Sequence, residues 1–546
     1  MLAACVPGTP KGPRSSAPPA PTESGETPES ASGSSQPTAT RSPDSSTTEP
    51  AAGEASTSPA TDAEQESDEE KQQRKRRNIL LKTVYDDRAV GEDQTVLVEA
   101  ELGIYENEDL ERYVRSVALR LLRHAPSRPF DWKFKIVDQR VPNAFALPGG
   151  KIYVSRGLLA LVNSEDELAA VIGHEITHSA ERHAAGRIEH ARRISPLTIG
   201  YRRAATIAAY GREHERDADR GGQILAAKAG YDPNGIATFL RKLDASERYE
   251  VGWSRLPSFL STHPTSPERS ALASQRAAGL SWERVRGVAA GQPYGYRGKI
   301  DGLVLGDDPA GGLFKDGRFV HPDLRFSLRF PPGWTTANNP QAVSAMAPAR
   351  DAEASLTVVG EAGQLEKAVD DFFEENADGM AMKVLERRPV QIRGISGIRI
   401  VGKARGLHVE MAFFEHAGLT FRLTLLSVKG AAGKYRGRTN AFMQSFRPLD
   451  SHGIYSLEVT RLRIARALQN ETLEQLSKRT HNDLELVYTG VLNDLFASTQ
   501  LAKGQAIKIG LGEPYFPKSK REDETKETTE GDPNPNPLPA PGAAVR

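Results

Sequence analysis

The segment His174-Glu175-Ile176-Thr177-His178 has the form H-E-x-x-H, which constrains the chain to present two imidazoles and a carboxylate from one helix. A helix advances about 3.6 residues per turn, so side chains four positions apart leave the same face. His174 and His178 can therefore hold one metal ion, with Glu175 beside them to accept a proton from water. The pentapeptide predicts a catalytic zinc site. An ordinary surface helix that carries two histidines is the alternative interpretation.

The residues before and within the motif support a helix at this place. Ser164 precedes the run and Glu167 follows three positions later, which is the pattern of a capping box. Apolar residues then recur at helical spacing and give one apolar face. We therefore expect a helix that begins after Ser164 and packs one face against a core.

A catalytic zinc site usually has three protein ligands and one open position. The charged run 212–219 leads into an apolar stretch and predicts a second helix. Glu215 could be the third ligand, and Asp219, four residues later, could accept a hydrogen bond from a ligand imidazole. Spacing alone does not exclude the competing charged residues, which are Glu213, His214 and Asp217.

Four segments in this order resemble the motifs of the zinc peptidase family M48. They are H-E-x-x-H, the E-x-x-A-D pattern that starts at Glu215, the run 143–159, and Thr262-His263-Pro264. The resemblance spans about residues 86–280. It implies a zinc metalloendopeptidase with one Zn2+ per chain, held by His174, His178 and Glu215.

The run 143–159 contains apolar stretches on both sides of Pro148-Gly149-Gly150, which predicts a hairpin. The edge of a strand beside a metal site can pair with an extended peptide through main-chain hydrogen bonds. We therefore expect Asn143, Ala144 and Phe145 to bind substrate. A hairpin that only packs under the helix is the alternative.

His263 lies in a segment rich in Thr, Ser and Pro, and three roles are open to it. It could donate to the oxyanion formed in peptide hydrolysis, or serve the structure alone. It could also fill the open metal position as an inhibitory fourth ligand, a role known in relatives that the chain resembles. Arg269 is a second oxyanion candidate, and His183 is expected to support the helix.

The start of the chain, Leu2-Ala3-Ala4-Cys5, resembles a lipobox, and Cys5 is the chain's single cysteine. In bacterial lipoproteins this cysteine carries the lipid, although only Met1 stands here in place of a signal peptide. Residues 1–78 are otherwise rich in Ser, Thr, Pro and Glu, which predicts a disordered tether. We expect a membrane anchor on Cys5. A chance L-A-A-C sequence is the alternative.

The charge and hydropathy of the chain limit the kinds of partner that it is expected to bind. The 546 residues include 71 basic and 71 acidic side chains, so no nucleic-acid partner is expected. No run approaches the roughly 20 apolar residues that span a bilayer. Together with the resemblance, this favours the soluble branch of the family in the bacterial cell envelope, in the periplasm and as an outer-membrane lipoprotein.

The expected fold class is α+β, with several domains in sequence. Residues 79–286 would form a mostly helical zinc-peptidase domain with a small hairpin, and 287–320 a glycine-rich linker. Residues 321–450 would form an α+β domain on an antiparallel sheet, whose role the sequence does not reveal.

The last domain, 455–510, resembles a LysM-like module with the order strand, helix, helix, strand. The resemblance implies binding to peptidoglycan. Asn470-Glu471 stands where such modules usually have Gly-Asp, so a scaffold without glycan binding is the alternative. Residues 511–546 are charged and then Pro-rich, and we expect a disordered tail.

These observations predict a zinc metalloendopeptidase that cuts extended or misfolded cell-envelope proteins, with Glu175 as the general base. A protein of a different class is the alternative: a non-proteolytic chaperone or cell-wall-binding adaptor that uses the peptidase fold as a binding module. The intact Glu175 argues against the adaptor, because a binder has no need of a general base.

Overall fold

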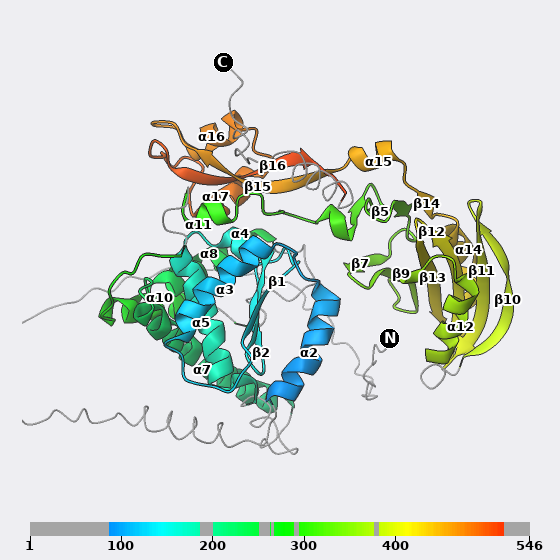
Figure 1. Cartoon of the computed structure of the whole chain (residues 1–546), viewed down its shortest axis with the longest axis horizontal. Helices are drawn as coiled ribbons and strands as arrows, with labels where there is room; N and C mark the ends of the chain where they lie inside the picture. The colour runs from blue at the N-terminus through cyan, green and yellow to red at the C-terminus, as the bar shows by residue number, and fades with distance from the viewer. Residues whose placement is uncertain are drawn as a thin grey trace, which may run out of the picture. The chain divides into compact units, whose positions relative to one another are not determined.

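The structure is a computed structural model that describes residues 87–185, 200–250, 263, 267–288, 294–375 and 382–517. Cys5 and the predicted tether 1–78 lie outside these residues, as do residues 518–546 of the predicted tail. Helices and mainly antiparallel sheets make up the described chain (Figure 1), which confirms the predicted mixed class. None of the helices described here has the length and apolar character needed to cross a membrane.

The peptidase part is built around a small sheet. Strand β1 (Lys133–Val137) runs parallel to β3 (Lys151–Ser155), and β2 (Ala144–Leu147) is antiparallel to β3. The predicted hairpin is therefore present, with its turn at residues 148–150. Because the strand order is β1-β3-β2, the outer edge of β2 is an edge of the sheet.

Helices lie on both sides of this sheet (Figure 1). Helices α3 (Glu108–Leu122) and α5 (Glu165–Ala180) share an apolar core with the sheet's inner face. Helix α2 (Asp87–Leu102) lies on the outer face, where the Tyr153 hydroxyl donates to Glu99 at 2.9 Å.

Helix α5 begins as predicted, but its capping box is only half formed. The backbone N–H of Glu167 donates to Ser164 Oγ at 3.2 Å. The Glu167 carboxylate does not return to Ser164; it accepts from the Asn163 N–H at 2.7 Å and pairs with Lys242. Lys242 lies on α8 (Gly235–Glu250) and is 2% exposed, so its buried charge attracts the carboxylate away from the cap.

Helix α7 (Gly200–Lys228) crosses α5 where both helices carry glycine. A Cβ atom on Gly222 would lie 2.7 Å from the His174 backbone nitrogen, and one on Gly173 would lie 3.1 Å from the Gly222 carbonyl oxygen. Larger side chains would push the helices apart. The glycine contact thus brings the face of α7 that carries Glu215 close to the face of α5 that carries His174.

Part of the segment expected to be a linker belongs to the core. Tyr296 and Ile300 are 5% and 1% exposed and pack with the peptidase core. Further along, the Gly302 N–H donates to the Leu462 carbonyl at 2.8 Å. This segment therefore extends the pair formed by β15 (Glu458–Arg466) and β16 (Ala506–Pro514).

The C-terminal part has the predicted strand–helix–helix–strand order: β15, α16 (Leu473–Arg479), α17 (Leu486–Asn493) and β16. Lys508 of β16 is fully buried, and its ammonium donates to the carbonyls of Leu161 and Val162 at 3.2 Å each. These carbonyls close the end of helix α4 (Arg156–Leu161), where a cation is favourable. The C-terminal part is therefore tied to the residues that lead into α5.

The α+β domain predicted for residues 321–450 has an antiparallel sheet with the order β10-β11-β12-β13-β9-β8-β7, and its first strand begins earlier, at Leu313. Helix α12 (Leu365–Glu375) packs on one face of this sheet and α14 (Ala432–Met443) on the other. The strands are β7 (Thr335–Asn339), β8 (Ala342–Met346), β9 (Ala352–Glu361), β10 (Lys383–Ile392), β11 (Ile395–Ala404), β12 (Leu407–His416) and β13 (Leu419–Val428). A second sheet pairs β4 (Leu313–Lys315), β5 (Arg318–His321), β6 (Phe326–Leu328) and β14 (Arg447–Pro448).

Candidate metal centre

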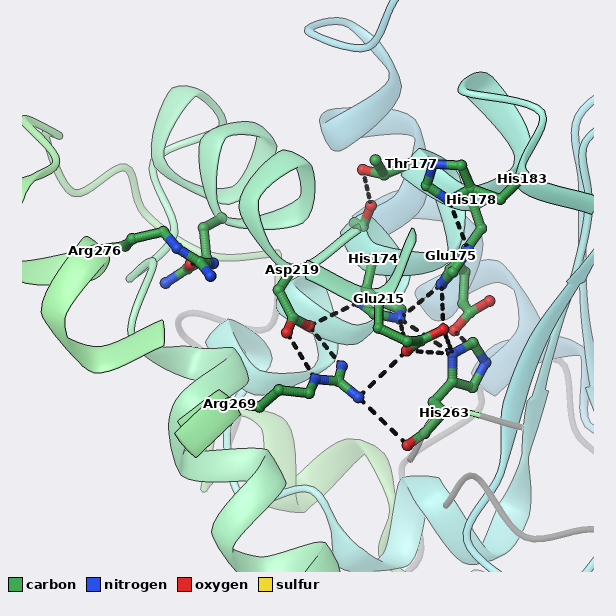
Figure 2. Close-up of polar contacts among 12 residues, drawn as sticks. His174, Glu175, Thr177, His178, His183, Glu215, Asp219, His263, Arg269 and Arg276 are labelled. Atoms are coloured by element: carbon green, nitrogen blue, oxygen red, sulfur yellow. Dashed lines mark hydrogen bonds and ion pairs between the residues drawn. The ribbon is translucent and has the colours of Figure 1, made fainter. Parts of the chain in front are cut away.

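Four buried side chains bring nitrogen and oxygen atoms to one point between α5 and α7 (Figure 2). The Nε2 atoms of His174 and His178 are 3.0 Å apart, as expected for residues one helical turn apart. The carboxylate of Glu215 lies 3.5 Å from His174 Nε2 and 3.4 Å from His178 Nε2. One donor atom from each of these three residues and from His263 all lie within 4.8 Å of one another.

Among the charged residues that spacing left open, the structure places Glu215 beside the two histidines. Glu215 is 3% exposed and faces α5, whereas Glu213 and Asp217 are half-buried on other sides of α7. His214 is buried, but its ring stacks on His183 with centroids 4.2 Å apart. Two imidazoles and one carboxylate are donors that catalytic zinc takes in proteins, so the residues present fit a zinc ion.

Asp219 supports the first histidine from behind. Its Oδ1 atom lies 3.0 Å from His174 Nδ1, so it orients the ring with Nε2 toward the other ligands. Arg269 grips Asp219 with two hydrogen bonds of 2.8 Å, from Nε and Nη2 (Figure 2). The guanidinium of Arg269, predicted as an oxyanion donor, is thus committed to Asp219, with Nη1 3.3 Å from Glu215.

His183 supports the second histidine. Its Nδ1 atom lies 2.9 Å from His178 Nδ1, on the ring edge that faces away from the ligand cluster. We predicted a supporting role for His183, and in the structure the residue that it contacts is His178. His183 lies five residues after His178, and the sequence carried no signal for this contact or for its stacking on His214.

Burial and charge together determine the protonation of the ligands. Burial alone would lower the pKa of His174, but the carboxylates of Asp219 and Glu215 raise it to about 10. Burial lowers the pKa of His178 to about 3, against the opposing effect of Glu215. Burial alone would raise the pKa of Glu215, but the surrounding imidazoles hold it well below its usual range. Imidazoles bind a metal ion in their neutral form, so a bound ion would displace any proton that these carboxylates favour on His174.

A cavity of about 300 Å³ opens beside this cluster. Phe145 lines it together with Ala146, Leu147 and Pro148, and Glu175, His178 and His263 lie at its metal end.

The side chains of Asn143 and Ala144, which we expected to bind substrate, are 3% and 0% exposed. The Asn143 N–H donates to Ser155 Oγ at 2.8 Å, which holds this end of β2 inside the fold. The part of β2 that faces the cavity therefore lies one residue or more closer to the turn.

A helix that carries H-E-x-x-H, a carboxylate from a second helix and a strand edge beside them form the arrangement typical of a metallopeptidase site. Residues 105–277 match Peptidase family M48, which confirms the predicted resemblance to that family over this part of the chain.

Curated relatives share this domain. Mitochondrial metalloendopeptidase OMA1 of Schizosaccharomyces pombe is 34% identical over 173 residues, which cover 29% of this chain and 50% of the relative. Beta-barrel assembly-enhancing protease of Escherichia coli K12 is 32% identical over 192 residues, which cover 31% of this chain and 39% of the relative. The chain thus spans half or less of the length of these relatives.

The solution structure of a cyanobacterial PsbP protein from Synechocystis sp. PCC 6803 was also matched. It is 12% identical, and the match covers 26% of this chain and 99% of that one, with a TM-score of 0.22. A TM-score this low does not establish a shared fold.

Proposed function

We propose that the chain is a zinc-dependent endopeptidase that cuts extended or misfolded segments of cell-envelope proteins, with Glu175 as the general base. The observation that carries this proposal is the convergence of His174, His178 and Glu215 beside the fully buried Glu175, at a cavity along a strand edge. An extended chain can pair with such an edge through its main chain. This pairing requires that the substrate segment be unfolded, and the main-chain hydrogen bonds themselves depend little on its sequence.

In this proposal each side chain of the site has a separate role in peptide hydrolysis. A divalent metal held by His174, His178 and Glu215 would supply Lewis acidity toward water and the peptide carbonyl. Glu175 is placed to take a proton from the attacking water and to deliver it to the leaving amine. Asp219 keeps the His174 ring oriented for these steps.

The envelope location is part of the proposal. Support comes from the likeness to the bacterial β-barrel assembly-enhancing protease, and from the lipobox-like sequence at Cys5. In this proposal Cys5 carries the membrane anchor and residues 455–510 contact peptidoglycan. Fractionation of cells that express the full chain should find it with the envelope, and Cys5→Ser should release it from the membrane fraction.

A direct test measures metal and activity on the purified full chain. We expect one zinc ion per chain by elemental analysis, and cleavage of casein, which is an unfolded substrate. A chain that binds zinc and leaves casein intact, or one that binds no metal, would contradict the proposal.

Of the three roles open to His263, the geometry favours that of an inhibitory fourth ligand. Its Nδ1 atom lies 2.9 Å from Glu215 Oε2 and 3.3 Å from His174 Nε2, inside the ligand cluster. We expect His263→Ala to raise casein cleavage about tenfold, because a position held closed most of the time becomes open. Initial rates at matched zinc content provide the measurement.

His124, an exposed histidine of the same domain, is the matched control, and His124→Ala should cleave casein at the wild-type rate. A fall in the rate of His263→Ala would instead assign His263 to the oxyanion. An unchanged rate would make it a structural residue.

A further inference from the structure

We propose that the ion pair between Asp87 and Arg182 determines which substrate side chain the cavity accepts. The pair forms a neutral part of the wall beside the metal site, so that the cavity takes an uncharged, apolar side chain next to the scissile bond. This inference rests on the proposed function and names the substrate preference of the same site.

The cavity has the size and lining of a pocket for one side chain. Its volume of about 300 Å³ is at the small end of ligand-binding clefts, which hold roughly 300–1,000 Å³. Much of its wall is apolar, formed by Phe145, Ala146, Leu147, Pro148 and Ala184. An apolar side chain would gain free energy by leaving water for this wall.

Charge enters the cavity wall at two places. Glu175, His178 and His263 belong to the metal end, and among the other lining residues that the structure describes the charged ones are Asp87 and Arg182. The Arg182 Nε–H donates to Asp87 Oδ2 in a short ion pair, with side chains 9% and 12% exposed. Two charges at such low exposure are tolerated because they neutralise each other. Within this pair a charged substrate side chain would meet no net countercharge.

The backbone at Arg182 has a left-handed conformation. Arg182 has φ of 56° and is the second residue after the end of α5, the left-handed position where helices commonly place glycine. A residue with a Cβ atom is strained in this conformation. From this position the Arg182 guanidinium reaches the cavity wall.

Asp87 is the first residue of α2, and the backbone there lies close to the hairpin turn. A Cβ atom on Gly149 would lie 2.9 Å from the Asp87 carbonyl oxygen, and one on Gly91 would lie 2.0 Å from that of Pro148. The first turn of α2 therefore touches the hairpin turn that continues β2. Asp87 also lies before residues 105–277, so the pair joins the family domain to a helix outside the family match.

The pair predicts opposite effects for its two halves. Asp87→Asn makes the cavity more positive by one charge and should favour an acidic substrate side chain. Arg182→Gln makes it more negative by one charge and should favour a basic one. With both substitutions the wall is neutral again, and the apolar preference should return.

The experiment uses the full chain and a set of fluorogenic peptides that differ only in one residue next to the scissile bond: leucine, glutamate or lysine. Wild type should prefer leucine in kcat/KM. Asp87→Asn should raise the glutamate-to-leucine ratio about tenfold or more, mainly through KM, because close charge pairs contribute at least this much to binding. Arg182→Gln should raise the lysine-to-leucine ratio likewise, and the double variant should restore the wild-type order.

The same preferences are measured as Kd in chains that also carry Glu175→Gln, so that the pair is tested even without hydrolysis. A wild type that cleaves none of the peptides contradicts the proposed function, while the Kd ratios still decide the role of the pair. Ratios that stay unchanged in both single variants overturn the inference. So does an equal loss for all three peptides that the double variant fails to restore, because the pair would then be purely structural.

Discussion

Replacing Glu175 with glutamine should lower casein cleavage by roughly 10²–10⁴-fold and leave one zinc per chain, since a positioned general base contributes about this factor. Glutamine has the shape of glutamate but cannot take a proton at neutral pH. The residue is fully buried and is absent from the four-residue ligand cluster, so the metal should stay bound. Steady-state rates and elemental analysis of the same preparation measure both quantities.

Glu181→Gln is the matched control for this experiment. It removes the same charge from a half-buried glutamate that follows the last residue of α5, outside the residues that line the cavity. This variant should cleave casein as fast as wild type. A Glu175→Gln chain that retains full activity would refute the mechanism. An inactive wild type that still binds unfolded proteins would favour the chaperone or adaptor instead.

The metal helix could be predicted almost completely because its determinants are local. Ser164 marks the start of α5, and four-residue spacing alone places His174 and His178 on one face. The hairpin before it was equally readable, since the turn at residues 148–150 has the required glycines, with φ of 77° and 84° at Gly149 and Gly150. Local backbone preference and the structure agree at these places.

The contacts that join distant segments could not be predicted. The pairing of Gly302 with Leu462 spans a whole domain of sequence, and nothing local in the segment 294–305 distinguishes a core element from a glycine-rich linker. Lys508 is a stronger case, because a lysine in a strand normally indicates a solvated face. Its burial depends on three successive carbonyls at the end of α4, which only the tertiary structure brings to it.

The support of the metal ligands was only partly predictable. Helical spacing from Glu215 to Asp219 indicated the hydrogen bond to His174, and the structure has these atoms 3.0 Å apart. The side chain that holds Asp219 in turn is Arg269, fifty residues away on another helix. The positive charge of Arg269 suggested an oxyanion donor, because the sequence does not reveal that Asp219 is its partner.

Substitution of Glu215 tests directly whether this residue is the third metal ligand. Glu215→Gln should weaken zinc binding by more than about 100-fold and abolish casein cleavage, because loss of a supporting residue alone already costs 10–100-fold. The neutral amide is a poorer donor than the carboxylate, and it leaves the cation beside His174 and His178 without its countercharge. Competition with a chromogenic chelator gives the zinc affinity, and casein cleavage at saturating zinc gives the residual activity.

Glu213→Gln and Asp217→Asn remove the same charge on either side of Glu215, in the same helix, and serve as matched controls. Both side chains are half-buried outside the ligand cluster, so both variants should bind zinc and cleave casein like wild type. If Glu213→Gln or Asp217→Asn loses zinc while Glu215→Gln keeps it, the third ligand is misassigned. If all three lose zinc equally, the charge of α7 as a whole attracts the metal, and the specific contact of Glu215 with the two imidazoles is not what holds it.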